Sequence, residues 1–264
     1  MINVMKAQKY QVLRSISTYA VSLIALVLMW TVIFSEVLSD DTDKLSASLF
    51  ASYIGELNVT IMPILILVYT GLICGSDLSD KTINYELLSG VKRRDVFFGR
   101  FFVVLIVNVI MYIIFAVLPI LIFALVFGWG HTMSVHDVVL RYVTGLFPLI
   151  RFTAFYALIA FIVRSTAGVI ALGYILSMVE MLSVIMLNEL FNTKVTMYLF
   201  TYDIFNRILA PQNMGYGFFD GEDVMVVKDV LEKETILHAS AACIIGTAVF
   251  LIISYAVMCR RDMN

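Results

Sequence analysis

Long apolar runs separated by short polar connections set the hydrophobic pattern of this 264-residue chain. A helix needs about 20 apolar residues to cross about 30 Å of hydrocarbon at 1.5 Å per residue, and six runs meet that length. They cover residues 17–37, 57–76, 98–127, 142–164, 167–188 and 236–259. The pattern therefore predicts an all-α, polytopic membrane protein with six transmembrane helices in a single domain, residues 1–264.

Composition excludes an ordinary soluble domain. Hydrophobic residues make up 61% of the chain and charged residues only 14%, whereas soluble domains carry about 25% charged residues. The three cysteines, Cys74, Cys243 and Cys259, fall within or at the ends of the apolar runs. We therefore expect no extracellular disulfide framework.

The distribution of cations predicts the orientation. If the N-terminus is cytoplasmic, six spans return the C-terminus to the same side. Eleven of the 18 Lys and Arg residues then lie inside: Lys6, Lys9, Arg14, Lys81, Lys92, Arg93, Arg94, Arg100, Arg164, Arg260 and Arg261. Cations near span ends favour the cytoplasmic side, so we predict that both termini are cytoplasmic.

Two segments outside the spans have their own patterns. Residues 1–16 mix apolar and cationic positions, which is typical of an amphipathic helix lying in the membrane interface. The external segment 189–235 is too long for a structureless loop in a compact domain. Within it, residues 197–209 and 224–235 predict short amphipathic helices that plug or cap the bundle.

Small residues and prolines mark particular spans. The second span carries a motif for close helix packing, and spans two to four each contain one proline. Gly71 and Gly75 form a small-xxx-small face that allows another helix to approach closely. Pro63, Pro119 and Pro148 lie inside the second, third and fourth spans, where neighbouring helices can tolerate the kinks that proline introduces.

Two ionisable residues lie deep within spans. Arg151 is in the fourth span and Glu180 in the fifth, each 13 residues from the tight turn that joins the two helices, or about 20 Å along the helix. An isolated charge at such depth costs at least about 2.5–3.5 kcal/mol, which favours pairing. The pair either faces a polar cavity that handles substrate or is a buried salt bridge that fixes helix register.

No segment has the pattern of a catalytic or metal site. His131 and His136 lie near Asp137, but two histidines five residues apart with one acid do not match a metal site, which needs three or four ligands at suitable spacing. HExxH, GxSxG and GxxxxGK[ST] motifs are absent from the sequence, and no cytoplasmic segment could hold a nucleotide-binding domain. We expect no enzyme activity, bound metal or cofactor in this chain, and no nucleic-acid partner.

The cytoplasmic segment between the second and third spans predicts a short capped helix. Ser79 and Asp80 are N-cap residue types, residues 82–89 can form about two turns, and Gly90 is a natural stop. Such a helix would present Ile83, Leu87 and Leu88 on one side. It would be followed by Lys92, Arg93 and Arg94 at the headgroups. These features predict a coupling helix that fits a groove on a cytoplasmic partner.

At this point the sequence resembles the permease subunits of ABC-2-type transporters. In that family the same loop commonly reads acidic–x–Gly–Thr–x–x–Leu–Leu–x–x–Pro–x–x–Arg. The matching positions in DKTINYELLSGVKRRDVFFGR are Asp80, Thr82, Leu87, Leu88 and Arg94. Lys81 stands in place of the family's glycine, and Val91 stands near its usual proline. The basic–Asp ending YAVMCRRDMN and the order of the segments are also similar to the family.

The resemblance implies that membrane transport and ATP hydrolysis are carried out by separate subunits. Two six-helix permeases, identical or related, would pair with two separate cytoplasmic ATPase subunits that bind ATP and Mg²⁺. The expected contacts with the ATPase are Asp80, Thr82, Ile83, Glu86, Leu87, Leu88 and Arg94. The short chain looks most like bacterial permeases for lantibiotic immunity or bacitracin resistance. That likeness implies a bacterial cell membrane, lipid contact, and export of an amphipathic peptide, antibiotic or lipid-like substrate.

The sequence also fits two other classes of function. A sensor or scaffold would dock a kinase or other regulator on the same cytoplasmic loop without transporting anything. An intramembrane enzyme would use Glu180, although the sequence offers no second catalytic group beside it.

Overall fold

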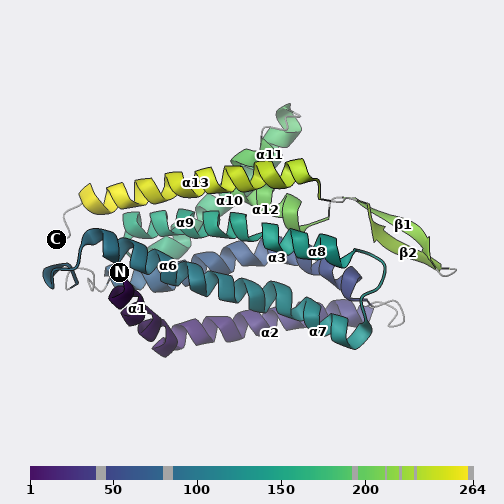
Figure 1. Cartoon of the computed structure of the whole chain (residues 1–264), viewed down its shortest axis with the longest axis horizontal. Coiled ribbons are helices and arrows are strands. Elements are labelled where there is room, and N and C mark those ends of the chain that lie inside the picture. Colours follow the sequence, from purple (N-terminus) through teal and green to yellow (C-terminus); the bar gives the residue numbers. More distant parts are fainter. Residues whose placement is uncertain are drawn as a thin grey trace.

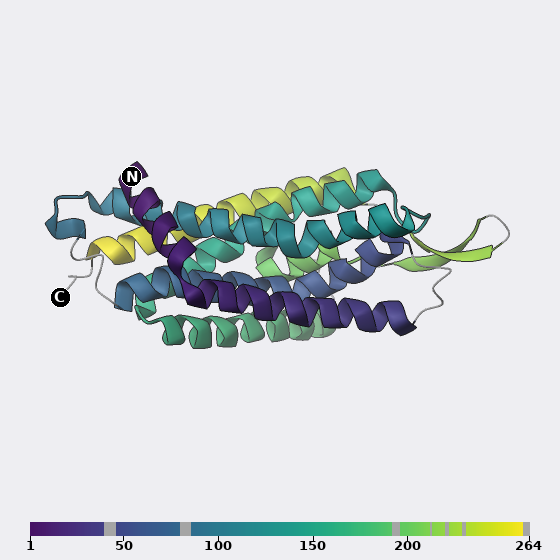
Figure 2. The same cartoon turned by 90° about the horizontal axis from the view of Figure 1, so that it is seen from below.

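The structure is a computed structural model. It describes residues 1–39, 46–79, 86–191, 196–211, 213–219, 222–228 and 231–260. Long helices lie side by side along one axis, with a β-hairpin projecting from one end (Figures 1 and 2). The N-terminus and the last turn of the final helix meet at the other end. There the Met1 ammonium is 3.6 Å from Asp95, and Arg93 donates to the Cys259 carbonyl at 2.8 Å.

The chain begins with two helices set at an angle. α1 (Ile2–Arg14) and α2 (Ile16–Ser39) meet at a bend of 59°. The predicted N-terminal helix is therefore present, and it crosses the end of the bundle rather than continuing along it (Figure 2).

Within the described residues, five helical segments are long and apolar enough to cross a membrane, and a sixth is counted if the bent α1–α2 pair forms one span. The five segments are Ala47–Gly75, Arg93–Phe127, Val135–Val163, Thr166–Leu187 and Lys233–Arg260. They comprise α3 (Ala47–Thr70), α6 (Arg93–Tyr112), α7 (Leu118–Phe127), α8 (Val135–Thr144), α9 (Leu146–Val163), α10 (Thr166–Phe191) and α13 (Lys233–Arg260), with two π-helical turns, η2 (Gly71–Gly75) and η3 (Ile113–Val117). α4 (Ser76–Ser79) follows η2.

The second predicted span begins ten residues earlier than its hydropathy indicates, at Ala47 instead of residue 57. Ser46 caps the helix by accepting from the Leu49 amide at 3.4 Å. Small and polar side chains fill the first turns, and Ser48 and Ser52 are fully buried against protein. Hydropathy misses this part because it scores transfer to lipid, whereas these residues pack against other helices.

α9 is the central helix. It contacts α3, α6, α10 and α13, and most of its side chains are buried. Leu149, Ala154, Tyr156, Ala157 and Ala160 are fully inaccessible. α9 therefore touches most of the other spans, including the one that ends the chain.

The predicted close-packing face of the second span is confirmed. A Cβ on Gly75 would lie 2.9 Å from the Thr166 Cα, and a Cβ on Gly71 would lie 3.0 Å from Ile170 Cγ1. The helix that approaches these glycines is α10 of the same chain.

The segment between the last two spans contains both helix and strand. α11 (Thr196–Leu199) and α12 (Thr201–Leu209) fall within the predicted 197–209 region and its edge. The helix predicted over 224–235 is wrong, because β2 (Glu222–Val227) pairs antiparallel with β1 (Met214–Phe219), Met214 opposite Val227. The β-branched run VMVV favours a strand once a partner strand lies beside it. The fold is all-α apart from this hairpin, as far as the described residues show.

Candidate functional site

α12 is a short helix held inside the bundle. Ile204, Phe205, Ile208 and Leu209 are all 2% exposed or less, and their spacing places them on one face of the helix. That face packs against α3, α8, α9 and α10. The segment between the last two spans therefore returns into the bundle, which agrees with the plug or cap predicted from the sequence.

Two glycines let the C-terminal end of α12 approach the spans. Gly55 of α3 lies under the Leu209 carbonyl, so closely that a Cβ there would overlap with the oxygen. Gly145, between α8 and α9, leaves room for the Leu209 side chain, because its Cβ would lie 3.2 Å from Leu209 Cδ2. A larger residue at Gly55 would displace the end of α12.

Glu180 caps the N-terminal end of α12. Its Oε1 accepts a hydrogen bond from the Tyr202 amide at 3.1 Å. The first amides of a helix have no partner within the helix, and the helix dipole favours a negative charge there. The carboxylate thus satisfies a helix terminus inside the bundle.

Arg151 holds the turn just before α12. Its Nη2 donates to the Leu199 carbonyl at 2.5 Å, and its Nη1 lies 3.5 Å from the Ala242 carbonyl of α13. The side chain is only 8% exposed. Gly246 of α13 makes the space, since a Cβ there would lie 2.6 Å from Arg151 Nε.

The direct salt bridge predicted between Arg151 and Glu180 is not formed. The ion pairs of the described residues do not include one between these two side chains. The two residues do lie on adjacent helices, and they bind backbone groups of residues 199–202 instead. The backbone thus supplies the polar partners that each charge needs away from water.

Arg141 holds the other end of α12, although it is not among the site residues predicted from the sequence. Its Nη1 donates to the Ile208 carbonyl at 3.1 Å, and its Nε donates to Asp137 Oδ2 at 2.9 Å. The second carboxylate oxygen of Asp137 lies 3.4 Å from the Leu231 amide. The i,i+4 spacing of Asp137 and Arg141 was the available signal. We name Glu180, Arg151 and Arg141 the α12 clamp.

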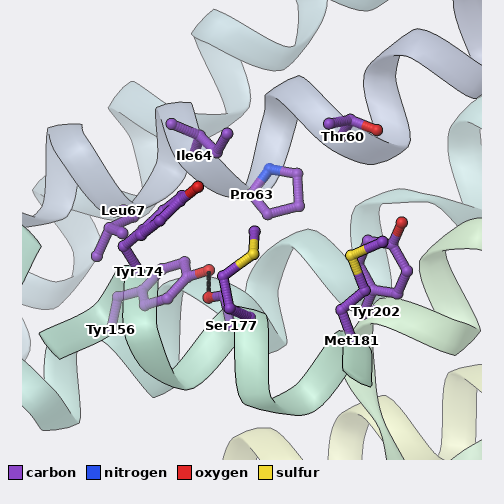
Figure 3. Close-up of a pocket in the computed structure, with 10 residues that line it drawn as sticks. Thr60, Pro63, Ile64, Leu67, Tyr156, Tyr174, Ser177, Met181 and Tyr202 are labelled. Carbon is purple, nitrogen blue, oxygen red and sulfur yellow. Dashed lines mark hydrogen bonds between the residues drawn. The ribbon is translucent and has the colours of Figure 1, made fainter. Parts of the chain in front are cut away.

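A small cavity lies beside the clamp. Its volume is about 70 Å³, enough for several water molecules or part of an apolar group. Figure 3 shows side chains of α3, α9, α10 and α12 around it, and Tyr156 and Ser177 share a hydrogen bond of 2.8 Å across it. Tyr202, whose amide Glu180 binds, closes one end.

The cavity opens sideways between α3 and α10. Ile64 of α3 and Tyr174 of α10 line it and are 39% and 46% exposed. Both belong to segments that are apolar and long enough to span a membrane. Hydrocarbon of a bilayer would therefore reach this opening.

At the opposite end of the bundle, the described part of the predicted coupling helix ends as expected. Residues 86–88 are helical, and Gly90 has φ of +87°. The Gly90 amide donates to the Leu87 carbonyl at 3.0 Å and the Val91 amide to the Glu86 carbonyl at 3.2 Å. These two bonds make a Schellman motif, so the predicted glycine stop is confirmed. Asp80, Thr82 and Ile83 lie outside the described residues.

The two leucines of this segment have different environments. Leu87 is half-buried and packs against a cluster of Val96, Phe97, Phe161 and Met258, which come from α6, α9 and α13. Leu88 is 83% exposed. We call residues 86–91 the docking segment.

One charged residue lies within the docking segment and others follow it in α6. Arg94, one of the predicted ATPase contacts, is exposed in the first turn of α6. Glu86 forms an ion pair with Arg100 of α6 at 2.7 Å, and the Arg100 side chain is completely buried. The sequence placed Arg100 on the cytoplasmic side without giving it a role.

Comparisons with known proteins add no family. No protein-family model matches the chain. No curated protein sequence matches it either.

Proposed function

We propose that this chain is the transmembrane permease subunit of an ATP-driven exporter of the ABC-2 type, with ATP and Mg²⁺ bound by a separate cytoplasmic ATPase. The observation that carries the proposal is the docking segment. Its helical end is stopped by Gly90 and fixed to the bundle, yet it presents Leu88 almost fully to solvent. An exposed leucine on a fixed backbone is suited to a groove on another protein.

The proposed topology has six spans, with the bent α1–α2 pair as the first. The end of the bundle that contains Met1, the docking segment and the last turn of α13 is cytoplasmic. The exposed cations Lys92, Arg93 and Arg94 support this orientation, because they lie at the start of a span. The proposed location is the bacterial cell membrane.

The proposed substrate is an amphipathic peptide, antibiotic or lipid-like molecule that reaches the protein from the bilayer. The sideways opening between α3 and α10 supports this class, because an apolar group could enter from hydrocarbon. The hydroxyl groups of Tyr156, Ser177 and Tyr202 would meet its polar atoms. A second permease, a copy or a paralogue, would complete the transporter.

In this mechanism the chain performs no covalent chemistry. The partner's movement reaches the docking segment and then the inner ends of α6, α9 and α13. At the outer end, α12 is held by the α12 clamp and by its apolar face against α3, α8, α9 and α10, so a concerted shift of these helices would weaken both contacts and release it. Release of α12 would open the outer side for the substrate.

The test is affinity purification of the tagged full-length chain from its native membrane in mild detergent, followed by mass spectrometry and an ATPase assay. We expect a stoichiometric ATPase subunit whose turnover rises with amphipathic peptides. Capture of a kinase, or of no partner, would contradict the proposal and would favour the sensor or scaffold function. ATP hydrolysis without any response to peptides or lipid-like molecules would overturn the substrate class.

A further inference from the structure

The docking segment is attached to the bundle at two kinds of contact. The first is the ion pair between Glu86 Oε2 and Arg100 Nη1 at 2.7 Å, in which the Arg100 side chain is 0% and the Glu86 side chain 25% exposed. The second is apolar, with Leu87 and Val91 against the cluster that contains Phe97. Both contacts lead to α6, which begins two residues after the segment ends.

Phe97 also packs against side chains of two more spans. Its ring centroid is 5.0 Å from that of Phe161 in α9 and 5.6 Å from that of Tyr255 in α13. Rings at these distances are packed against one another. The helices that would have to move when the docking segment moves are therefore α6, α9 and α13.

The ion pair differs from the apolar contact in directionality. Apolar packing allows Leu87 to slide over the cluster, because dispersion contacts depend little on angle. A short charge-assisted hydrogen bond fixes the two groups in distance and direction. Removing one partner of a buried pair is strongly destabilising, because a charge is left without compensation.

We infer that the Glu86–Arg100 ion pair is the rigid link that transmits movement of the docking segment to α6, with Arg100 as its positioning residue. The inference rests on the proposed function. In this role Arg100 does not contact the ATPase; through Glu86 it holds the backbone of the docking segment at one angle to α6. The apolar contact alone leaves the segment attached but free to rock.

A neighbouring ion pair provides the matched control. The Met1 ammonium and Asp95 lie 3.6 Å apart at the same end of the bundle, with side chains 46% and 38% exposed. Exposed pairs of this kind contribute little, because water and salt screen them. Asp95→Asn therefore removes a charge pair near the docking segment without removing the link.

The first measurement uses spin labels in the full chain, with Cys259→Ser to remove the exposed cysteine and a nitroxide on Ser89→Cys. Arg100→Gln is expected to loosen the label, shifting the ratio of docked to undocked segment by about tenfold, the factor that ~1.4 kcal/mol represents. Arg100→Lys, which keeps the charge, is expected to shift it less. A label equally mobile in wild type, Arg100→Lys and Arg100→Gln would overturn the link.

The second measurement uses the purified complex in nanodiscs, with nitroxides on Leu125→Cys and Leu237→Cys, two exposed positions on α7 and α13. Adding Mg·ATP is expected to shift the distance between the labels in wild type and in Asp95→Asn. In Arg100→Gln the shifted fraction per bound ATPase is expected to fall about tenfold. An unchanged shift with the ATPase bound would overturn the inference alone, whereas purification without any ATPase would overturn the proposed function and the inference with it.

Discussion

At the residue scale, the charges of the α12 clamp show what a sequence can and cannot reveal. Arg151 and Glu180 stand out because charges are rare inside apolar spans, and their equal depth predicted proximity. Their true partners are backbone carbonyl and amide groups of residues 199–202. A backbone group carries no residue identity, so no pattern of side chains could have predicted these contacts.

Glu180 is expected to stabilise α12 through both its charge and its acceptor oxygen. Glu180→Leu leaves the Tyr202 amide without its acceptor and should lower the free energy of unfolding by about 1–3 kcal/mol. Glu180→Gln keeps an acceptor and loses only the favourable charge at the helix N-terminus, about 0.3–1 kcal/mol. Denaturant unfolding in detergent measures both, and equal stability of wild type and Glu180→Leu would contradict the capping role.

Gly246 is expected to be essential for the position of Arg151. A Cβ at Gly246 would lie 2.6 Å from Arg151 Nε, so Gly246→Val should displace the guanidinium and loosen residues 199–202. Ala241→Val, on an exposed position of the same helix, is the control. Labelling of Leu199→Cys by a water-soluble maleimide should be faster in Gly246→Val than in the control. Equal labelling rates would show that Arg151 does not hold this turn.

At the element scale, the hydrophobic pattern predicts the long spans and α12, but it misses the hairpin and the start of α3. Apolar runs identify spans because lipid imposes one length on all of them. The strand Glu222–Val227 pairs with Met214–Phe219, and the Asp220-Gly221 dipeptide between them in the sequence is typical of a hairpin turn. The helical periodicity of residues 224–235 competes with that signal, so the apolar pattern alone predicts the wrong element. The start of α3 is buried by other helices, so hydropathy underestimates it.

The contact of η2 with α10 allows a graded test at two glycines. A Cβ on Gly75 would meet backbone, the Thr166 Cα, at 2.9 Å, whereas a Cβ on Gly71 would meet the flexible Ile170 side chain at 3.0 Å. Gly75→Ala is therefore expected to cost about 1–3 kcal/mol of stability and Gly71→Ala less, because a side chain can move aside and backbone cannot. Thermal unfolding of the two variants measures the order, which a greater loss in Gly71→Ala would refute.

At the scale of the whole molecule, one helix joins the two ends. α9 carries Arg151 of the α12 clamp and Phe161 of the apolar cluster around Phe97, ten residues or about 15 Å apart along the helix. The fixed length of the helix lets a tilt at one end reach the other. The sequence predicted the docking segment and the plug separately, and their connection through α9 required the packing of the helices.

The exposed and half-buried leucines of the docking segment should have separable effects. Leu88→Asp is expected to leave unfolding unchanged within about 0.5 kcal/mol, as for exposed sites in general, and to abolish stimulation of the partner ATPase by substrate. Leu87→Asp is expected to lower the free energy of unfolding as well, because Leu87 packs against the apolar cluster around Phe97. ATPase assays and unfolding curves of both variants measure this, and normal stimulation in Leu88→Asp would refute the docking role.

The most direct test of the account is photo-crosslinking from Leu88 in living cells, with a benzophenone amino acid at that position and at Tyr216 as a control. Tyr216 is 73% exposed and lies on the hairpin at the opposite end of the bundle. If Leu88 docks on the ATPase, position 88 is expected to crosslink to a nucleotide-hydrolysing cytoplasmic subunit, whereas position 216 is not. Crosslinking of position 88 to a kinase, to an extracytoplasmic protein or to nothing would contradict it.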